Sequence, residues 1–159
     1  MNVLLDTNIW ISGLLWGGNP RKIIQLAITK QIVLYSSKLL IDELRLTLAY
    51  PKLQRRLATL EITAEELLIE VSQITQLSYP VHLFTIPELR DPKDKIVLET
   101  ALSVPVEIIV SGYKDLLILR EFQKIPILTT KQFLENYQFL YMEQKINQKL
   151  PIVYRKRIR

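Results

Sequence analysis

Four acidic residues carry the chemistry that this sequence could perform: Asp6, Glu43, Asp94 and Asp115. If they lie close together, like charges disfavour mutual ionisation, so such a cluster needs a cation to be stable. Ligands that offer only oxygen suit Mg²⁺ or Mn²⁺. An ion of this kind can activate a water molecule and stabilise charge on a phosphate during in-line displacement. The four acids therefore raise the hypothesis of metal-dependent phosphate chemistry.

Each acid lies at or near the carboxyl end of an expected strand, in the turn or helix that follows it. The expected strands are residues 3–5, 32–35, 80–84, 107–110 and 125–128. In open parallel sheets, sites form beyond these carboxyl ends. Asp6 ends a buried strand, where an acid has no routine structural duty. By contrast, Asp94 and Asp115 could simply cap helices, and Glu43 could belong to a solvated helix face.

The strands alternate with segments of helical pattern. Helices are expected over residues 9–15, 21–29, 38–50, 64–76, 92–101, 115–122 and 130–140. Ser36 or Ser37 can cap the third of these, Pro51 closes it, Thr63 opens a capping box, and Asp91 precedes a proline at a helix start. Strands and helices in alternation predict a three-layer α/β/α sandwich with a central, mostly parallel sheet of four to five strands.

Composition narrows the possible chemistry. The 159 residues, 48% hydrophobic and 23% charged, fit one compact domain. The chain has no cysteine and a single histidine, His82, which excludes thiolate catalysis, Cys-bearing zinc sites and His-rich metal sites. No apolar run reaches the ~20 residues of a membrane span, and the first residues lack the basic region of a signal peptide. A cytoplasmic protein without membrane contact is expected.

The net charge of +5 is confined to the end of the chain. Lys/Arg and Asp/Glu are equal in number over residues 1–140, the expected domain, whereas residues 141–159 hold six basic residues against Glu143. The basic residues of this tail are Lys145, Lys149, Arg155, Lys156, Arg157 and Arg159. Such a tail can bind a polyanion through counterion release, and RNA is the candidate. It can equally be a solvated terminus.

Five motifs follow one another in a recognisable order. They are Val3-Leu-Leu-Asp6-Thr7-Asn8, Ser37 with Glu43-Leu44, Asp91-Pro-Lys-Asp94 with Leu98 and Ala101, Ser111-Gly-Tyr-Lys-Asp115-Leu-Leu, and Pro126-Ile-Leu-Thr129 to Phe133-Leu134. Together they resemble the PIN-domain (PilT N-terminal) ribonuclease family, which includes the VapC-like toxins of toxin–antitoxin pairs. The resemblance runs from Met1 to about Leu140.

This resemblance implies an Mg²⁺- or Mn²⁺-dependent endoribonuclease with RNA as its substrate. It implies that the four acids are catalytic and that Asp6, Asp94 and Asp115 hold the metal. It further implies a homodimer and, for a toxin, a cognate antitoxin protein. Asn8, Thr7 and Ser111 are candidates to orient the carboxylates or to bind phosphate oxygens. The alternative is that such residues cap the turns after their strands.

One departure from the family pattern concerns the metal. The family usually has an acid at the position of Tyr113, and a neutral phenol is a poor ligand for a hard metal ion. Either Asp115 and water complete the coordination, or metal affinity and turnover are reduced. A second function class therefore stays open: a PIN-fold module that binds RNA or protein with weakened or absent catalysis.

Overall fold

The computed structural model describes the backbone of residues 1–79 and 92–149 and the side chains of residues 1–79 and 94–142. Several sequence predictions therefore lie outside the described residues. They are the strand at 80–84 with His82, the helix cap at Asp91, the basic residues Arg155, Lys156, Arg157 and Arg159, and the side chains of Lys145 and Lys149.

A six-stranded sheet forms the centre of the molecule, in the order β3-β2-β1-β4-β6-β5. Its strands are β1 (Asn2–Leu5), β2 (Val33–Ser37), β3 (Thr75–Ser78), β4 (Ile108–Val110), β5 (Glu121–Phe122) and β6 (Ile125–Leu128). The first four neighbouring pairs are parallel and the last pair, β5 with β6, is antiparallel. The predicted, mostly parallel sheet is thus confirmed, with two strands that the sequence did not predict at these residues, β3 and the short β5.

Strand β5 belongs to a hairpin that the sequence pattern did not indicate. Gln123 and Lys124 connect β5 and β6, and both have positive φ, 51° and 68°. Positive φ at both turn residues is typical of a type I′ turn, for which Asn-Gly is the usual sequence signal. Gln-Lys carries no such signal, so residues 121–122 were wrongly assigned to the end of a helix.

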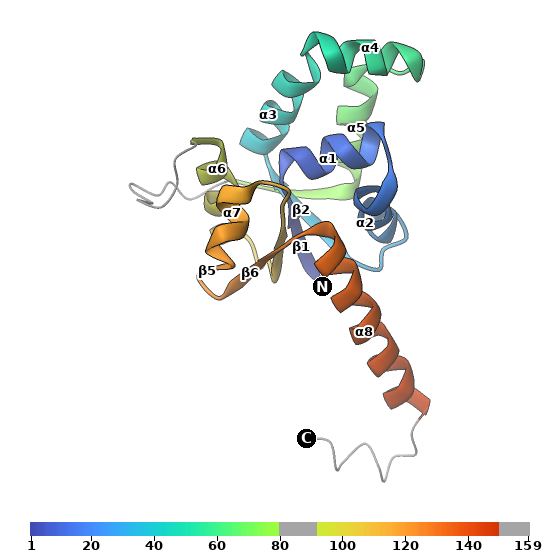
Figure 1. Ribbon diagram of the computed structural model, residues 1–159, viewed down its shortest axis with the longest axis vertical. Coiled ribbons are helices and arrows are strands. Elements are labelled where there is room, and N and C mark those ends of the chain that lie inside the picture. Colours follow the sequence, from blue (N-terminus) through green and yellow to red (C-terminus); the bar gives the residue numbers. More distant parts are fainter. Residues whose placement is uncertain (80–91, 150–159) are drawn as a thin grey trace.

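Eight helices surround the sheet within the described residues. They are α1 (Thr7–Leu15), α2 (Gly18–Ile28), α3 (Lys38–Leu48), α4 (Pro51–Thr59), α5 (Ala64–Ile74), α6 (Pro92–Leu102), α7 (Lys114–Leu119) and α8 (Thr130–Lys149). Figure 1 shows α6 and α7 on one side of the sheet and α1 and α2 on the other, with α8 extending away from the body. None of these helices combines the length and the apolar character needed to cross a membrane.

The sheet separates two hydrophobic clusters. Val3 and Leu5 pack into the cluster under α1, α2, α3 and α5, whereas Leu4 packs into the cluster under α6 and α7. All three side chains are at most 1% exposed. Because successive strand residues point to opposite faces, the apolar run Val3–Leu5 of β1 means that both faces are covered. This is the three-layer arrangement that the sequence predicts.

Among the element boundaries that differ from the sequence prediction, three change the description of the fold most. Pro51 does not merely close α3: it is the first residue of α4, a helix that was missed, and proline is favoured at that position. The helix expected to reach residue 76 ends at Ile74, where β3 begins. The last helix does not end near residue 140 but continues to Lys149, because no helix breaker occurs before Pro151.

Candidate active site

Asp6 lies where β1 ends, and its carboxylate connects two strands and a helix. Its Oδ1 accepts a hydrogen bond from the N–H of Ile9 at 2.8 Å, so Asp6 is the N-cap of α1. Its Oδ2 accepts the N–H of Gly112 at 2.9 Å and the hydroxyl of Ser111, both from the segment that follows β4. Asp6 therefore has a structural duty, contrary to the expectation from the sequence, and Ser111, one of the candidate orienting residues, donates to its carboxylate.

The site has the position that the topology favours. From β1 the chain first adds β2 and β3 on one side and later β4 and β6 on the other. Such a reversal of strand order opens a crevice at the carboxyl ends of the two central strands. Asp6 and Ser111 immediately follow β1 and β4, the strands that flank this point.

The burial of Asp6 has an electrostatic consequence. The side chain is completely buried, and this loss of hydration raises the pKa of Asp6 above its ordinary value. Hydrogen bonds from Ser111, Ile9 and Gly112 act in the opposite direction, because they stabilise the ionised form. The site thus holds a carboxylate that is costly to ionise, and a cation nearby would offset that cost.

Glu43 is buried and does not belong to a solvated helix face. It lies in α3 and is 8% exposed, and its Oε2 accepts a hydrogen bond from the hydroxyl of Thr7 at 2.9 Å. Its neighbour Asp42 has the surface role instead, with an ion pair to Lys38 at 3.0 Å. Because Thr7 directly follows Asp6, Glu43 is connected to the end of β1.

A second contact sets the position of α3 relative to α6. Ser37 caps α3 by accepting the N–H of Leu40 at 3.2 Å, which confirms one of the two predicted caps. The hydroxyl of Thr100, in α6, donates to the Ser37 hydroxyl at 2.9 Å. The helix that carries Glu43 is thereby joined to the helix that carries Asp94.

Asp94 and Asp115 line one hollow of about 150 Å³ together with Tyr113 and Lys114. Asp94 is in the first turn of α6 and 3% exposed, whereas Asp115 is in the first turn of α7 and exposed. The N–H of Tyr113 donates to the Ser111 hydroxyl at 3.0 Å, and that hydroxyl donates to Asp6. A short chain of contacts therefore leads from Asp6 to the hollow.

The four acids thus lie at one edge of the sheet, where they form two pairs. Thr7 connects Asp6 with Glu43, and the hollow unites Asp94 with Asp115. Within residues 1–79 and 94–142, no three acidic side chains approach closely enough to form a metal-binding group. Asn8 is exposed on α1, and Lys145 and Lys149 lie in α8.

The donor set fits a loosely held ion better than a closed cage. Mg²⁺ commonly keeps several waters and is bound through one or two carboxylates and substrate phosphates. Asp94 and Asp115 provide two carboxylates beside a hollow that also has room for water. A carboxylate has about four lone-pair positions, and three donors already use positions on Asp6. Asp6 can therefore offer a metal ion little more than one contact.

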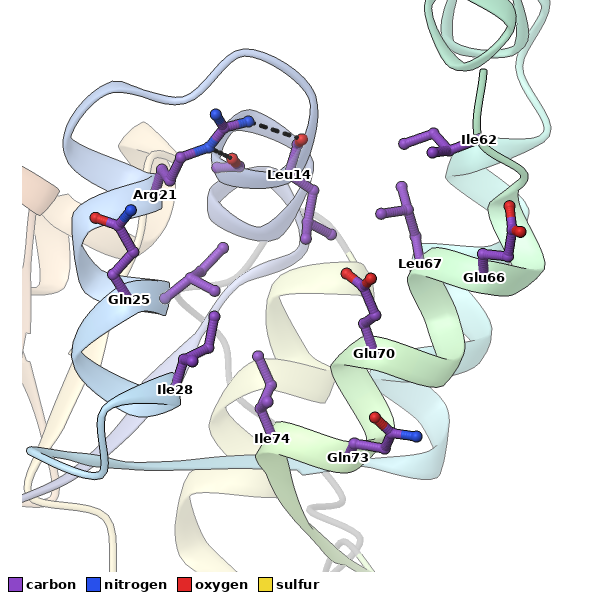
Figure 2. Close-up of a pocket in the computed structure, with 12 residues that line it drawn as sticks. Leu14, Arg21, Gln25, Ile28, Ile62, Glu66, Leu67, Glu70, Gln73 and Ile74 are labelled. Carbon is purple, nitrogen blue, oxygen red and sulfur yellow. Dashed lines mark hydrogen bonds between the residues drawn. The ribbon is translucent and has the colours of Figure 1, made fainter. Parts of the chain in front are cut away.

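A larger hollow of about 540 Å³ lies elsewhere, between α5 and the pair α1 and α2 (Figure 2). Its lining includes Arg21, Glu66 and Glu70 among apolar side chains. Arg21 donates to the carbonyl oxygens of Gly13 and Leu14, at 3.1 and 3.2 Å, and Glu66 completes the capping box of α5. These two charged groups are engaged in structure, so the acids at the sheet edge remain the better candidates for catalysis.

Sequence reasoning missed three contacts of the site. Thr100 lies inside a helix, and nothing in its neighbourhood indicates a bond to a serine 63 residues away. Gly112 supplies a backbone N–H, which its residue type alone does not reveal. Thr7 was a candidate to orient a carboxylate or to cap its turn, but the sequence did not indicate that its partner is Glu43.

The fold and the site define an α/β protein with acids at the carboxyl edge of a parallel sheet. The PIN-domain model matches residues 2–115, and the chain belongs to this family. It is also similar to the uncharacterized protein MJ1680 of Methanocaldococcus jannaschii, with 29% identity over 147 residues, 87% of this chain and 92% of the relative. No solved structure matches it significantly. The match confirms the predicted family and a fold of nuclease type.

Proposed function

We propose that this protein is a metal-dependent endoribonuclease, in which Asp94 and Asp115 hold Mg²⁺ or Mn²⁺ with Asp6 behind them. The observation that supports this best is that Asp94 and Asp115 line one hollow at the sheet edge where Asp6 also lies. A bound divalent ion would supply an activated water and charge stabilisation for phosphodiester hydrolysis. Asp6 and Glu43 would fix the geometry of the metal site, since both are buried and hydrogen-bonded.

The remaining residues of the site have separate duties in this proposal. Ser111 and Thr7 orient the buried carboxylates, because hydrogen bonds from outside the ligand set fix ligand direction. Lys114 is exposed at the hollow and can attract an RNA phosphate. Asn8 and the basic residues of the tail stay candidates for contact with the RNA backbone.

The proposal is tested by RNA cleavage with Mn²⁺ and with EDTA. Asp94→Asn and Asp115→Asn should each lower the rate by about 100-fold or more, because each removes a charged ligand from the ion. Asp42→Asn is the matched control, since Asp42 is a partly exposed acid that pairs with Lys38 outside the site. Equal cleavage by the two site variants and the control would contradict the assignment.

A binding module without catalysis is the second candidate function. Tyr113 favours it, as does the absence of a group of three acids among the described side chains. The same assay separates the two functions when RNA binding is measured in parallel. Binding without metal-dependent cleavage would support the module, whereas cleavage abolished by EDTA would support the enzyme.

We further propose that the enzyme is a toxin that an antitoxin protein inhibits. We also propose that it acts as a homodimer. Exposed apolar side chains in the middle of α8, Phe139 and Met142, offer a surface for a second copy. Growth arrest on expression, relieved by Asp94→Asn, would support the toxin role. Sedimentation of the wild type beside a Phe139→Ser, Met142→Ser double variant tests the dimer.

A further inference from the structure

The hollow between α6 and α7 presents a problem for an RNA ligand. Two of its four lining side chains are the carboxylates Asp94 and Asp115, and only Lys114 is basic. An RNA phosphate carries a negative charge, so the two acids oppose its approach wherever no ion compensates them. A contact that does not depend on charge would therefore help to hold the substrate at this place.

Tyr113 is the lining residue that can make such a contact. Its backbone is fixed at the start of α7 by the bond from its N–H to the Ser111 hydroxyl at 3.0 Å. Its ring is partly buried and packs against the hydrophobic cluster that contains Leu116 and Leu4. The ring is thus held in place while part of it borders the hollow, and a contact with a preorganised side chain loses little entropy on binding.

We propose that Tyr113 stacks on an unpaired nucleobase of the RNA and so positions the neighbouring phosphate at Asp94 and Asp115. The inference rests on the proposed function and assigns a substrate-binding role to the residue that occupies a place where an acid was expected. Stacking on an aromatic side chain tolerates any base, because every base has a π-face. Bases inside a duplex are already stacked on their neighbours, so the contact selects unpaired nucleotides.

The test measures RNA binding in EDTA, where no cleavage occurs. Fluorescence anisotropy follows a labelled oligouridylate of about ten nucleotides binding to the full chain. Tyr113→Leu should weaken binding about tenfold, and Tyr113→Phe should stay close to the wild type, because the ring and not the hydroxyl makes the contact. Tyr50→Leu is the matched control, since Tyr50 is exposed at the start of α4.

Salt dependence separates stacking from charge. Tyr113→Leu should lose the same factor in affinity at low and at high salt, whereas Lys114→Ala should lose more at low salt, because only its contact is screened. An oligomer of the same length without bases should bind the wild type and Tyr113→Leu equally. Circular dichroism and melting of each variant show whether it is folded.

Three results would overturn the inference. They are equal binding of oligouridylate by the wild type and Tyr113→Leu, a loss as large in Tyr113→Phe as in Tyr113→Leu, and no binding of oligouridylate by the wild type. The proposed function can fail separately. Binding that depends on the Tyr113 ring, without any cleavage in Mn²⁺, would retain the stacking role and contradict the nuclease.

Discussion

Thr7 in α1 donates its hydroxyl hydrogen to Oε2 of Glu43 in α3 at 2.9 Å, across 36 residues of sequence. Both side chains are buried. This bond makes the residue after the first acid responsible for the orientation of the second, so the two acids nearest the centre of the sheet form one structural unit.

Thr7→Val should disturb this unit without changing the volume of the side chain. A buried hydrogen bond to a charged group contributes about 1.5–3 kcal/mol, so we expect a loss of about 2 kcal/mol in the free energy of unfolding and about a tenfold lower rate of RNA cleavage. Urea unfolding and cleavage rates measure the two effects.

Thr47→Val is the control for this substitution. Thr47 lies in α3 with Glu43, but its hydroxyl donates to the backbone carbonyl of Glu43 at 2.9 Å and not to the carboxylate. It should therefore leave cleavage almost unchanged. Equal effects of the two substitutions would mean that the bond between Thr7 and Glu43 has no special role.

The stability of the metal-free protein should depend on pH through Asp6. Burial raises the pKa of Asp6, so the folded state binds this proton more tightly than the unfolded state, whose pKa is about 3.9. The contribution of Asp6 to stability is therefore fully present below about pH 4 and is lost as the pH rises through the raised folded-state pKa.

Urea unfolding in EDTA at several pH values, for the wild type and Asp6→Asn, measures this dependence. The variant cannot ionise at this position, so its stability relative to the wild type should increase between about pH 4 and neutrality. A difference between the two proteins that stays constant with pH would contradict the predicted shift.

Much of the fold could be predicted because its signals are local. The capping box of Thr63 and Glu66, with Thr63 N to Glu66 Oε2 at 2.7 Å, depends on residues three apart. The apolar run of residues 3–5 in β1 likewise predicts a strand buried on both faces. The hairpin at Gln123 and Lys124 was missed because its two turn residues adopt positive φ without the usual glycine or asparagine.

The site could be predicted less completely, because its contacts join distant residues. The placement of Asp6 after β1 and of Asp115 at the start of α7 follows from expected strand ends, and the structure has both residues there. The bonds from Thr7 to Glu43 and from Thr100 to Ser37 depend on how helices pack, which no local pattern encodes. The metal-binding role of the acids stays a prediction.

Tyr113→Asp should increase metal affinity if the tyrosine weakens the site. An added carboxylate would border the same hollow as Asp94 and Asp115, and a third charged oxygen ligand favours Mg²⁺ or Mn²⁺. We expect at least about tenfold tighter Mn²⁺ binding, with lower stability in EDTA because three acids then repel one another. Calorimetry and melting measure the two effects.

The control for this increase in Mn²⁺ affinity is Tyr50→Asp, which introduces the same charge at an exposed position outside the hollow. It should not change Mn²⁺ affinity by more than a factor of about two, since exposed charges at a distance are screened. Unchanged affinity in Tyr113→Asp would show that this position does not contribute to the metal site.

Removal of residues 150–159 should weaken RNA binding in proportion to the charge removed. The segment contains Arg155, Lys156, Arg157 and Arg159 and no acid. On a single strand, each phosphate contact contributes about 0.7 to the magnitude of the slope of log affinity against log salt concentration. If all four residues contact phosphates, removing them should therefore lower that magnitude by about 3. Salt titrations monitored by anisotropy measure the slope. An unchanged slope would identify the segment as a solvated terminus.

Calorimetric titration with Mn²⁺, with RNA cleavage assayed on the same samples, tests the central claim most directly. We predict that the wild type and Asp42→Asn bind Mn²⁺ and cleave RNA, whereas Asp94→Asn and Asp6→Asn lose both. Failure of the wild type to bind Mn²⁺, or cleavage that persists in EDTA, would contradict a metal-dependent site built from these carboxylates.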